Sequence, residues 1–431
     1  MDTVILGGGL AGLSLAHFLK QKSVVLEKER QIGGLCRSFN FKGVMHDIGP
    51  HILFSKNKKA LGDITSLLDA DTIRRSNKIF YNSRLVKYPF ENDLASLDKE
   101  DREYCLKEFL SNPYENYEAS DMLKFFLKTF GEGITKLYLQ PYNEKIWKFD
   151  LAFMDTQMVD RIPKPPKEDV IKSAKGIPTE GYTHQLYFQY PKKGGIESLV
   201  KALEENARKK ARIVNPVKIG RVSMEGGAWK VKTDKGVFSA NKLVNCMPLH
   251  ELAKCIEMPD DVMKALGEMR YNSIYIVAVH AKKDAIGDNF ALYFADKDVI
   301  FHRLSKLSFL GKNYQPKEGA IILAEITFRP DSYLAGLSAR EIMGRVASDL
   351  EKIGLVRRKD VLDIEVKEFK YAYVIYDLHH RRNADYVLNH LSSEGIDCCG
   401  RFAEFEYLNM DGVMMHSCKL AEKLNGEGDG G

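Results

Sequence analysis

The chain has 431 residues, of which 44% are apolar and 29% are charged, and its formal net charge is +5. This length predicts two or three packed units. The small positive charge, without a dense Lys/Arg block, argues against nucleic acid as a partner and favours anionic small molecules. Seven scattered cysteines without a zinc-type spacing predict no catalytic metal and favour a reducing, cytoplasmic location. No apolar run after the N-terminus is long enough for a membrane span, so we expect no membrane partner.

The N-terminus predicts a dinucleotide site. Residues 3–6 form an apolar run typical of a buried strand, and residues 13–20 have helical periodicity. Between them, Gly7, Gly9 and Gly12 give G-x-G-x-x-G, with Leu10 and Ala11 inside the motif. The first glycine allows the turn, the second admits a pyrophosphate, and the third lets the helix pack on the strand. The N–H groups of the helix N-terminus would then face the phosphate charge.

A second strand, residues 23–26, ends at Glu27 and Lys28, where a carboxylate can accept hydrogen bonds from a ribose diol. A glycine pair that ends at Gly34 and is followed by Leu35 comes next. The whole stretch resembles the extended fingerprint of a large FAD superfamily. That superfamily includes amine oxidases, protoporphyrinogen oxidases, phytoene desaturases and UDP-galactopyranose mutases. The resemblance implies FAD, because there the second glycine pair runs beside the FAD diphosphate, whereas an NAD domain has no need of it.

The same resemblance implies an α/β protein with a discontinuous Rossmann-like FAD-binding domain, a helical insertion and an antiparallel-sheet substrate domain. The FAD-binding pieces are expected at residues 1–94, 190–262 and 385–425. Residues 95–189 would be the helical substrate-binding insertion and residues 263–384 the antiparallel sheet, with a disordered tail at 426–431. Within the FAD-binding pieces, the cofactor would also be contacted by Val217, Gly400, Arg401 and Met410.

One loop makes the resemblance to a single family within this superfamily more specific. The segment Asp47–Ser55 resembles the flavin-facing loop of UDP-galactopyranose mutases, and His51 occupies the place of a histidine near the flavin ring. The bacterial enzymes have a second histidine three residues later, where this chain has Phe54. The eukaryotic branch has an His-x-x-Phe-Ser pattern, which this chain matches.

Further matches to the mutase family follow in order along the chain. Tyr142 and Trp147 lie in a Tyr-x-Glu-Lys-x-Trp-like stretch, where the family places aromatic groups around uracil and sugar. The resemblance implies that Arg161 and Arg303 grip the diphosphate. Further substrate contacts would come from Tyr182, Tyr187, Tyr373 and Tyr407. Taken alone, each tyrosine could equally be a core residue and each arginine a solvated surface charge.

The segment Gly400–Asp411 closely resembles the bacterial Gly-Arg-Leu-Ala-Glu-Tyr-x-Tyr-x-Asp-Met motif. Two departures concern the substrate half of the family's site. Asn409 stands where the bacterial family has an aspartate, and Ile326 stands where it has a tyrosine. They put the identity of the sugar in doubt more than the flavin chemistry.

The residue types suit a sugar nucleotide. Two arginines can clamp a diphosphate with planar, charge-assisted hydrogen bonds, and tyrosine hydroxyls add neutral donors. The resemblance implies a mutase that interconverts UDP-galactopyranose and UDP-galactofuranose. N5 of reduced FAD would act as nucleophile at the anomeric carbon, with His51, Arg161 and Arg303 as catalytic residues. A reductant such as NAD(P)H would have to dock directly at the flavin, and a homodimer is compatible with this scheme.

Two alternatives remain open. The first is an FAD-dependent oxidoreductase of the amine oxidase or protoporphyrinogen oxidase type. Such enzymes use an apolar tunnel to the flavin and need no arginine pair for a diphosphate. The second is a non-catalytic flavin-binding protein whose sugar site has decayed, and only Asn409 and Ile326 support it.

Overall fold

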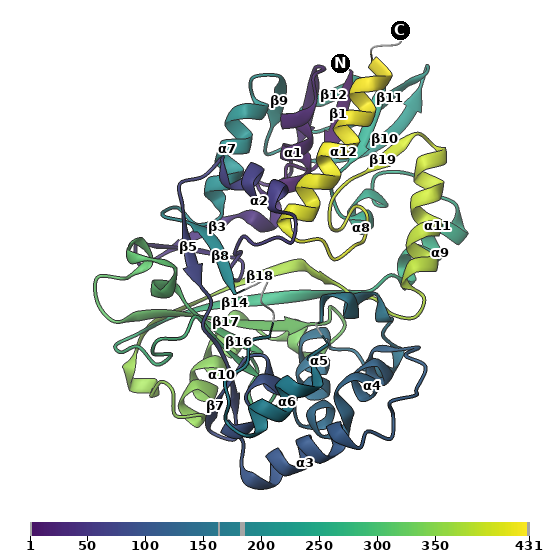
Figure 1. Cartoon of the computed structure of the whole chain (residues 1–431). Coiled ribbons are helices and arrows are strands. Elements are labelled where there is room, and N and C mark those ends of the chain that lie inside the picture. The colour runs from purple at the N-terminus through teal and green to yellow at the C-terminus, as the bar shows by residue number, and fades with distance from the viewer. Residues whose placement is uncertain (1, 163, 182–185, 429–431) are drawn as a thin grey trace.

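A five-stranded parallel sheet forms one end of the molecule, in the order β19-β13-β1-β2-β9. The computed structural model describes residues 2–162, 164–181 and 186–428 (Figure 1). The strands of this sheet are β1 (Thr3–Leu6), β2 (Ser23–Leu26), β9 (Ala211–Val214), β13 (Lys242–Asn245) and β19 (Ile396–Cys398). Continuous apolar runs are required because both faces of a parallel sheet are covered. The strands therefore come from the first, middle and last parts of the chain, as the resemblance implied.

Three helices accompany this sheet. Of these, α1 contacts both of the other two. They are α1 (Leu10–Phe18), α7 (Glu197–Ala207) and α12 (Met410–Gly428). A separate three-stranded meander consists of β10 (Ile219–Glu225), β11 (Ala228–Thr233) and β12 (Gly236–Ala240). Because α12 continues to Gly428, the disordered tail predicted for 426–431 begins too early; residues 429–431 lie outside the described part of the chain.

A seven-stranded sheet forms the middle of the molecule, in the order β18-β14-β17-β16-β15-β6-β7 (Figure 1). Neighbouring strands are antiparallel except β15 and β6, which are parallel. The strands are β6 (Asn77–Tyr81), β7 (Arg84–Lys87), β14 (Tyr271–Ala281), β15 (Ala291–Phe294), β16 (Arg303–Lys306), β17 (Ala320–Phe328) and β18 (Val361–Val374). The predicted boundary at residue 94 is therefore wrong for β6 and β7, which belong to this sheet and not to the nucleotide domain.

The helical insertion lies against the end of this sheet farthest from the parallel sheet (Figure 1). Its helices are α3 (Lys99–Leu110), α4 (Met122–Ile134), α5 (Gln140–Trp147) and α6 (Lys167–Ala174), with a π-helical turn at Thr135–Leu139 between α4 and α5. Beside the insertion (Figure 1), α10 (Ala339–Lys352) begins with a capping box between Ser338 and Glu341 and buries its apolar face against the sheet.

The remaining elements join these three parts. They are β3 (Ser38–Phe41), β4 (Val44–Asp47), α2 (Lys58–Thr65), β5 (Ala70–Arg74), β8 (Tyr187–Pro191), α8 (Leu249–Leu252), α9 (Asp260–Glu268) and α11 (His380–Ser393). The predicted α/β class is confirmed. Over the described ranges, the helices are all too short or too polar to cross a lipid bilayer.

Candidate functional site

The glycine motif forms a tight turn between β1 and α1. Gly7 has a φ of +103°, and a Cβ on Gly12 would lie 2.0 Å from the Gly7 carbonyl oxygen. Both positions therefore need glycine, one for its backbone conformation and one for the close approach of helix to strand. Leu10 and Ala11 follow Gly9 at the start of α1, whose N–H groups point away from the body of the helix. The turn has the geometry of a phosphate-binding loop.

The carboxylate of Glu27 holds this turn in place. It accepts hydrogen bonds from the Gly8 N–H at 2.7 Å and from the Glu29 N–H at 2.8 Å. The Glu27 backbone is fixed as well, since its carbonyl accepts from the Val217 N–H at 2.8 Å. Val217 is buried and Lys28 is exposed. A carboxylate offers about four acceptor positions, so Glu27 keeps acceptor capacity for a diol.

Two later segments close over the glycine turn. The Gly33 N–H donates to the Gly8 carbonyl at 2.8 Å, and a Cβ on Gly34 would come within 3.1 Å of the Gly9 Cα. From the other end of the chain, Gly400 has a φ of +113°, and its added Cβ would lie 2.6 Å from the Ala11 Cβ. Leu35 and Met410 pack beside these contacts as half-buried residues.

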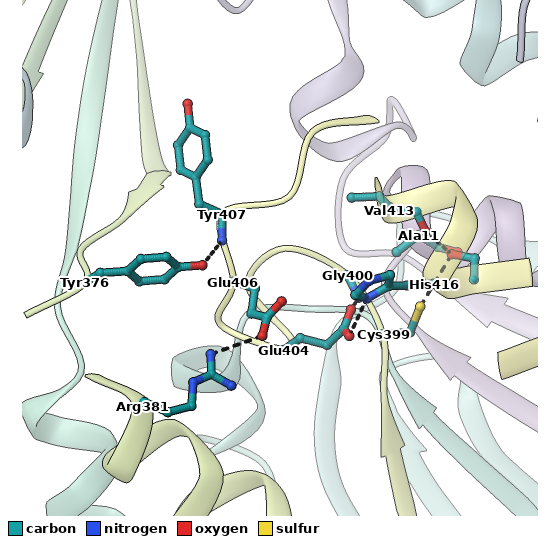
Figure 2. A network of polar contacts seen from close by, with 11 residues as sticks. Ala11, Tyr376, Arg381, Cys399, Gly400, Glu404, Glu406, Tyr407, Val413 and His416 are labelled. Atoms are coloured by element: carbon teal, nitrogen blue, oxygen red, sulfur yellow. Dashed lines mark hydrogen bonds and ion pairs between the residues drawn. The ribbon is translucent and has the colours of Figure 1, made fainter. Parts of the chain in front are cut away.

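The loop that follows Gly400 is fixed by a polar network (Figure 2). One Glu404 carboxylate oxygen accepts from the Gly400 N–H at 2.7 Å, and the other lies 2.7 Å from Nδ1 of His416 on α12. Further along, Arg381 donates to Glu406 at 3.0 Å, and the Tyr407 N–H donates to the Tyr376 hydroxyl at 2.8 Å. These hydrogen bonds fix the backbone of the loop. They thereby set the positions of the Arg401 and Tyr407 side chains.

Arg401 is a half-buried cation that has no carboxylate partner among the described residues. Its Nε and Nη2 atoms are buried and have no hydrogen-bond partner among the described residues. Its guanidinium lies 4.0 Å from the centroid of the Tyr407 ring and 5.7 Å from that of Tyr373. A buried, unpaired guanidinium is costly, so its nitrogens indicate a place for a polar ligand.

His51 lies at the end of a loop fixed by a buried carboxylate. Asp47 accepts from the Ser38 hydroxyl at 2.6 Å, the Tyr190 hydroxyl at 2.7 Å and the Ile196 N–H at 3.0 Å. Burial raises the pKa of Asp47 to about 6, against these hydrogen bonds. The His51 ring has a buried Nδ1 atom with no partner in the described part of the chain. Burial, together with the charges of Arg401 and Arg303, lowers the pKa of His51 to about 4.

The pKa of His51 gives a testable pH dependence. In the unfolded chain it would be about 6.5, so between pH 6.5 and 4 the unfolded state binds more protons and the folded state loses stability as pH falls. The full effect is about 3 kcal/mol, at about 1.4 kcal/mol per pKa unit. His51→Gln should remove this contribution, which urea unfolding between pH 4 and 7 would measure.

His416→Gln is the matched control for this pH dependence. Its hydrogen bond with Glu404 raises the pKa of His416, so this histidine contributes stability at low pH that is lost as pH rises. Its replacement should therefore lower stability below about pH 6.5, where the charged form is present. The same pH profile in wild type and His51→Gln would contradict the neutral, buried His51.

Three neighbouring strands place Tyr293, Arg303 and Glu325 in one row. Arg303 pairs with Tyr293 across β15 and β16, and with Glu325 across β16 and β17. The Arg303 guanidinium donates to the Glu325 carboxylate at 2.5 and 2.6 Å, in a bidentate geometry. The Glu325 side chain is 1% exposed and that of Arg303 is 25% exposed. The Nη1 nitrogen of Arg303 takes no part in this bidentate pair.

Aromatic rings surround this charged pair. Tyr142 stacks on Tyr138 with centroids 5.1 Å apart and makes an edge contact with Tyr293 at 5.6 Å. Burial raises the pKa of Tyr142 well above its usual value, so its hydroxyl stays a neutral donor. On the other side, Tyr373 stacks on Tyr407 at 5.8 Å, and the Trp147 ring contacts the edges of both.

The structure thus gathers most of the predicted site residues. Mutual electrostatic effects on pKa link His51 with Arg401 and Arg303, and Tyr373 with both arginines. Tyr187 lies outside this cluster, because its side chain is 55% exposed on β8, which pairs with β5. Arg161 ends the 3-10 helix Thr156–Arg161, but its side chain is outside the described part of the structure. Tyr182 also lies outside the described residues.

Sequence reasoning missed Glu325, Tyr293 and Tyr138. Tyr138 lies four residues before Tyr142, a helical spacing that indicates a shared face. Glu325 interrupts an otherwise apolar strand, and a buried carboxylate requires a partner. That signal was available, but its partner depended on strand register, which the sequence did not specify.

Ile326 does not line the site. It is fully buried on the face of β17 opposite to Glu325, in the apolar cluster that also contains residues of α10. The expectation that it belongs to the substrate half of the site is therefore wrong. Asn409 is exposed, and its carbonyl accepts from the Val413 N–H in the first turn of α12. Among the residues described, no cluster of three or more His, Cys, Asp or Glu side chains could hold a metal.

Known proteins match parts of this chain in sequence. The family model for an NAD(P)-binding Rossmann-like domain matches residues 5–66. UDP-galactopyranose mutase of Mycoplasma pneumoniae is 27% identical over 207 residues, which is 42% of this chain and 50% of that protein. The chain spans about half the length of the curated mutases that it matches.

Solved structures extend the likeness to the whole fold. A structure of reduced UDP-galactopyranose mutase superposes with a TM-score of 0.90 at 21% identity, covering 99% of this chain and 94% of that one. A candidate protoporphyrinogen oxidase of Exiguobacterium sp. 255-15 gives a TM-score of 0.78 at 17% identity, covering 99% of each chain. The chain therefore has the fold seen in UDP-galactopyranose mutase, with a Rossmann-like dinucleotide domain.

Proposed function

We propose that this chain is a flavoenzyme that binds FAD and interconverts the pyranose and furanose forms of an NDP-sugar. UDP-galactopyranose and UDP-galactofuranose are the expected pair. The observation that carries this proposal is the row of Tyr293, Arg303 and Glu325, which brings a strong cation and tyrosine rings beside His51 and Arg401. A diphosphate needs such a cation, and an apolar tunnel for amines does not.

The local structure supports FAD over NAD(P). The glycine turn alone would serve either cofactor. Gly34 closes over Gly9 and Gly400 closes over Ala11, so two additional segments form a longer cradle around the start of α1. The unpaired nitrogens of Arg401 and the unpaired Nδ1 of His51 fit the polar edge of a flavin ring. Glu27 would hold the ribose end.

The chemistry that reduced FAD supplies when bound is a nucleophilic N5 for the anomeric carbon of the sugar. Arg303 would hold the departing diphosphate and offset its charge, together with Arg161. Tyr142, Tyr373 and Tyr407 would donate neutral hydrogen bonds. Trp147 would fix the position of the sugar, and neutral His51 would hydrogen-bond without adding a second charge beside Arg401.

An oxidoreductase of the amine oxidase or protoporphyrinogen oxidase type is the second candidate. The similarity in fold to the Exiguobacterium protein favours it. It would use the same FAD cradle and would leave the Arg303–Glu325 pair without a direct role. The third hypothesis, a non-catalytic flavin-binding protein with a decayed sugar site, rested on Asn409 and Ile326. Because Ile326 faces the core, only Asn409 still supports it.

The test is turnover under reducing conditions. The purified protein, reduced with dithionite, should convert UDP-galactofuranose to UDP-galactopyranose, as followed by chromatography. The oxidised protein is the control and should be inactive. Failure to convert any UDP-hexose, together with flavin reduction by an amine or a porphyrinogen, would establish the oxidoreductase instead.

A further inference from the structure

A second cavity, with a volume of about 610 Å³, lies between the C-terminal end of α5, the segment 297–300 and α10. Arg303, Glu325 and Arg401 do not contribute to its lining, so it is separate from the site above. Its apolar floor is formed by Val299, Ile300 and Leu334. The charged lining residues are Glu144, Lys145, Lys148, Lys297, Asp298, Arg345 and Asp349.

The acidic groups of this lining already have partners. Glu144 lies 3.8 Å from Lys297, and Asp298 lies 2.8 Å from Lys352 on α10. Asp349 accepts from the Ile300 N–H at 2.7 Å. These hydrogen bonds and ion pairs are made to groups other than the lysines at the end of α5, although the charges of Asp296 and Asp349 favour the ammonium form of Lys145.

Lys145 and Lys148 form the unbalanced part of the lining. The Lys145 side chain is buried, and its ammonium donates to the Asp296 carbonyl at 2.5 Å, which is a neutral acceptor. The Lys148 ammonium has no hydrogen bond or ion pair within the described ranges and is only half-exposed. Burial, followed by the nearby charge of Lys148, lowers the pKa of Lys145 to about 7, and burial also lowers the pKa of Lys148. Lys148 is therefore a half-buried cation that a bound anion would pair with, next to an amine, Lys145, that is partly unprotonated near pH 7.

We propose that this cavity binds a small phosphate monoester, with its phosphoryl group at the ammonium of Lys148 and the rest of the molecule beside the amine of Lys145. The negative phosphoryl group complements the Lys148 ammonium, and the apolar lining residues accommodate the rest of the molecule. The cavity lies within the range of small-molecule sites, about 300–1,000 Å³. Trp147 lies between the two lysines in the sequence and faces Tyr373 and Tyr407. An occupant would thus contact the same helical turn that carries an aromatic residue of the nucleotide-sugar site.

Pyridoxal 5′-phosphate is a suitable probe, because it is a phosphate monoester with an aldehyde. In the holoprotein near pH 7, the Lys145 amine adds to the aldehyde carbon and water leaves as the imine forms. Borohydride then delivers a hydride, which gives a stable secondary amine that peptide mass spectrometry can locate. Lys145 should be labelled at least about tenfold faster than Lys201, an exposed lysine on α7 paired with Glu197.

Two controls separate phosphate recognition from simple amine reactivity. Pyridoxal, which lacks the phosphate, should label Lys145 much more slowly, and inorganic phosphate should protect Lys145 from pyridoxal 5′-phosphate. Lys148→Gln should slow labelling of Lys145 about tenfold, whereas Lys201→Gln should leave it unchanged. Equal labelling by pyridoxal, no protection by phosphate, or even labelling of surface lysines would each overturn the proposal. None of these results depends on whether the protein turns over a UDP-sugar.

Discussion

Glu325→Ala should destabilise the folded protein by about 3–5 kcal/mol, the usual cost of removing one partner of a buried ion pair. The Glu325 side chain is almost inaccessible, and its carboxylate accepts two hydrogen bonds from Arg303. After truncation the guanidinium would remain among Tyr142, Tyr293 and Tyr373 without an anion. Urea unfolding followed by circular dichroism measures the loss.

Two further variants show whether the loss of stability in Glu325→Ala comes from the unpaired charge or from lost packing. Glu325→Gln keeps the size of the side chain and one acceptor, so it should lose less stability than the alanine variant. The double variant Arg303→Met/Glu325→Leu should recover most of the stability, because apolar groups of similar size can replace a buried pair. A double variant as unstable as Glu325→Ala would show that packing, and not the unpaired charge, dominates.

The same pair predicts opposite effects on nucleotide binding. Arg303→Ala should weaken UDP binding by about 2–3 kcal/mol, because it removes a charged donor and leaves the Glu325 carboxylate facing the diphosphate. Glu325→Gln keeps the cation and removes a negative charge, so UDP affinity should be equal or higher. Isothermal titration of the folded variants tests both, and unchanged affinity in Arg303→Ala would remove Arg303 from the site.

Gly400→Ala is the second change with a large expected effect, and it should cost the protein most of its flavin. The new Cβ would lie 2.6 Å from the Ala11 Cβ, and the residue would be held at a φ of +113°. The strained backbone alone costs about 1–3 kcal/mol, and the steric clash pushes the loop away from the cofactor cradle. The ratio of flavin absorbance to protein absorbance after purification measures the loss.

Gly395→Ala is the matched control, since Gly395 also has a positive φ, +81°, but no atom lies within 4 Å of its added Cβ. It should lower stability modestly and leave the flavin content unchanged. If both variants lose flavin equally, backbone strain in this region is sufficient and the contact with Ala11 is not the cause.

Sequence patterns could predict those features that depend only on residues close together in the chain. The turn between β1 and α1 depends on Gly7 and Gly12, only five positions apart, and the hairpin of β10 and β11 has its turn glycines between the strands. Both are fixed by local sterics, and the structure contains the glycine turn where the sequence predicts it. Gly400 was identified through resemblance, because its contact with Ala11 spans almost the whole chain.

Features that depend on strand register could not be predicted in this way. Arg303 and Glu325 are 22 positions apart and meet only because β16 and β17 pair in one particular register. Side chains alternate between the two faces of a strand, and a shift of one residue in the pairing moves each side chain to the other face. Ile326 therefore faces the core while its neighbour Glu325 faces Arg303. The β6–β7 hairpin joins the seven-stranded sheet through a parallel pairing with β15, which lies about two hundred positions later.

The arrangement of the parallel sheet has a consequence for synthesis on the ribosome. The strand β1 is synthesised long before β19 and α12, and the Ser417 hydroxyl of α12 donates to the Ala11 carbonyl at 3.2 Å. A nascent chain that has reached only α11 would expose the edge of β13 and the outer side of α1. The cradle should therefore close only after α12 has been synthesised and has packed on α1.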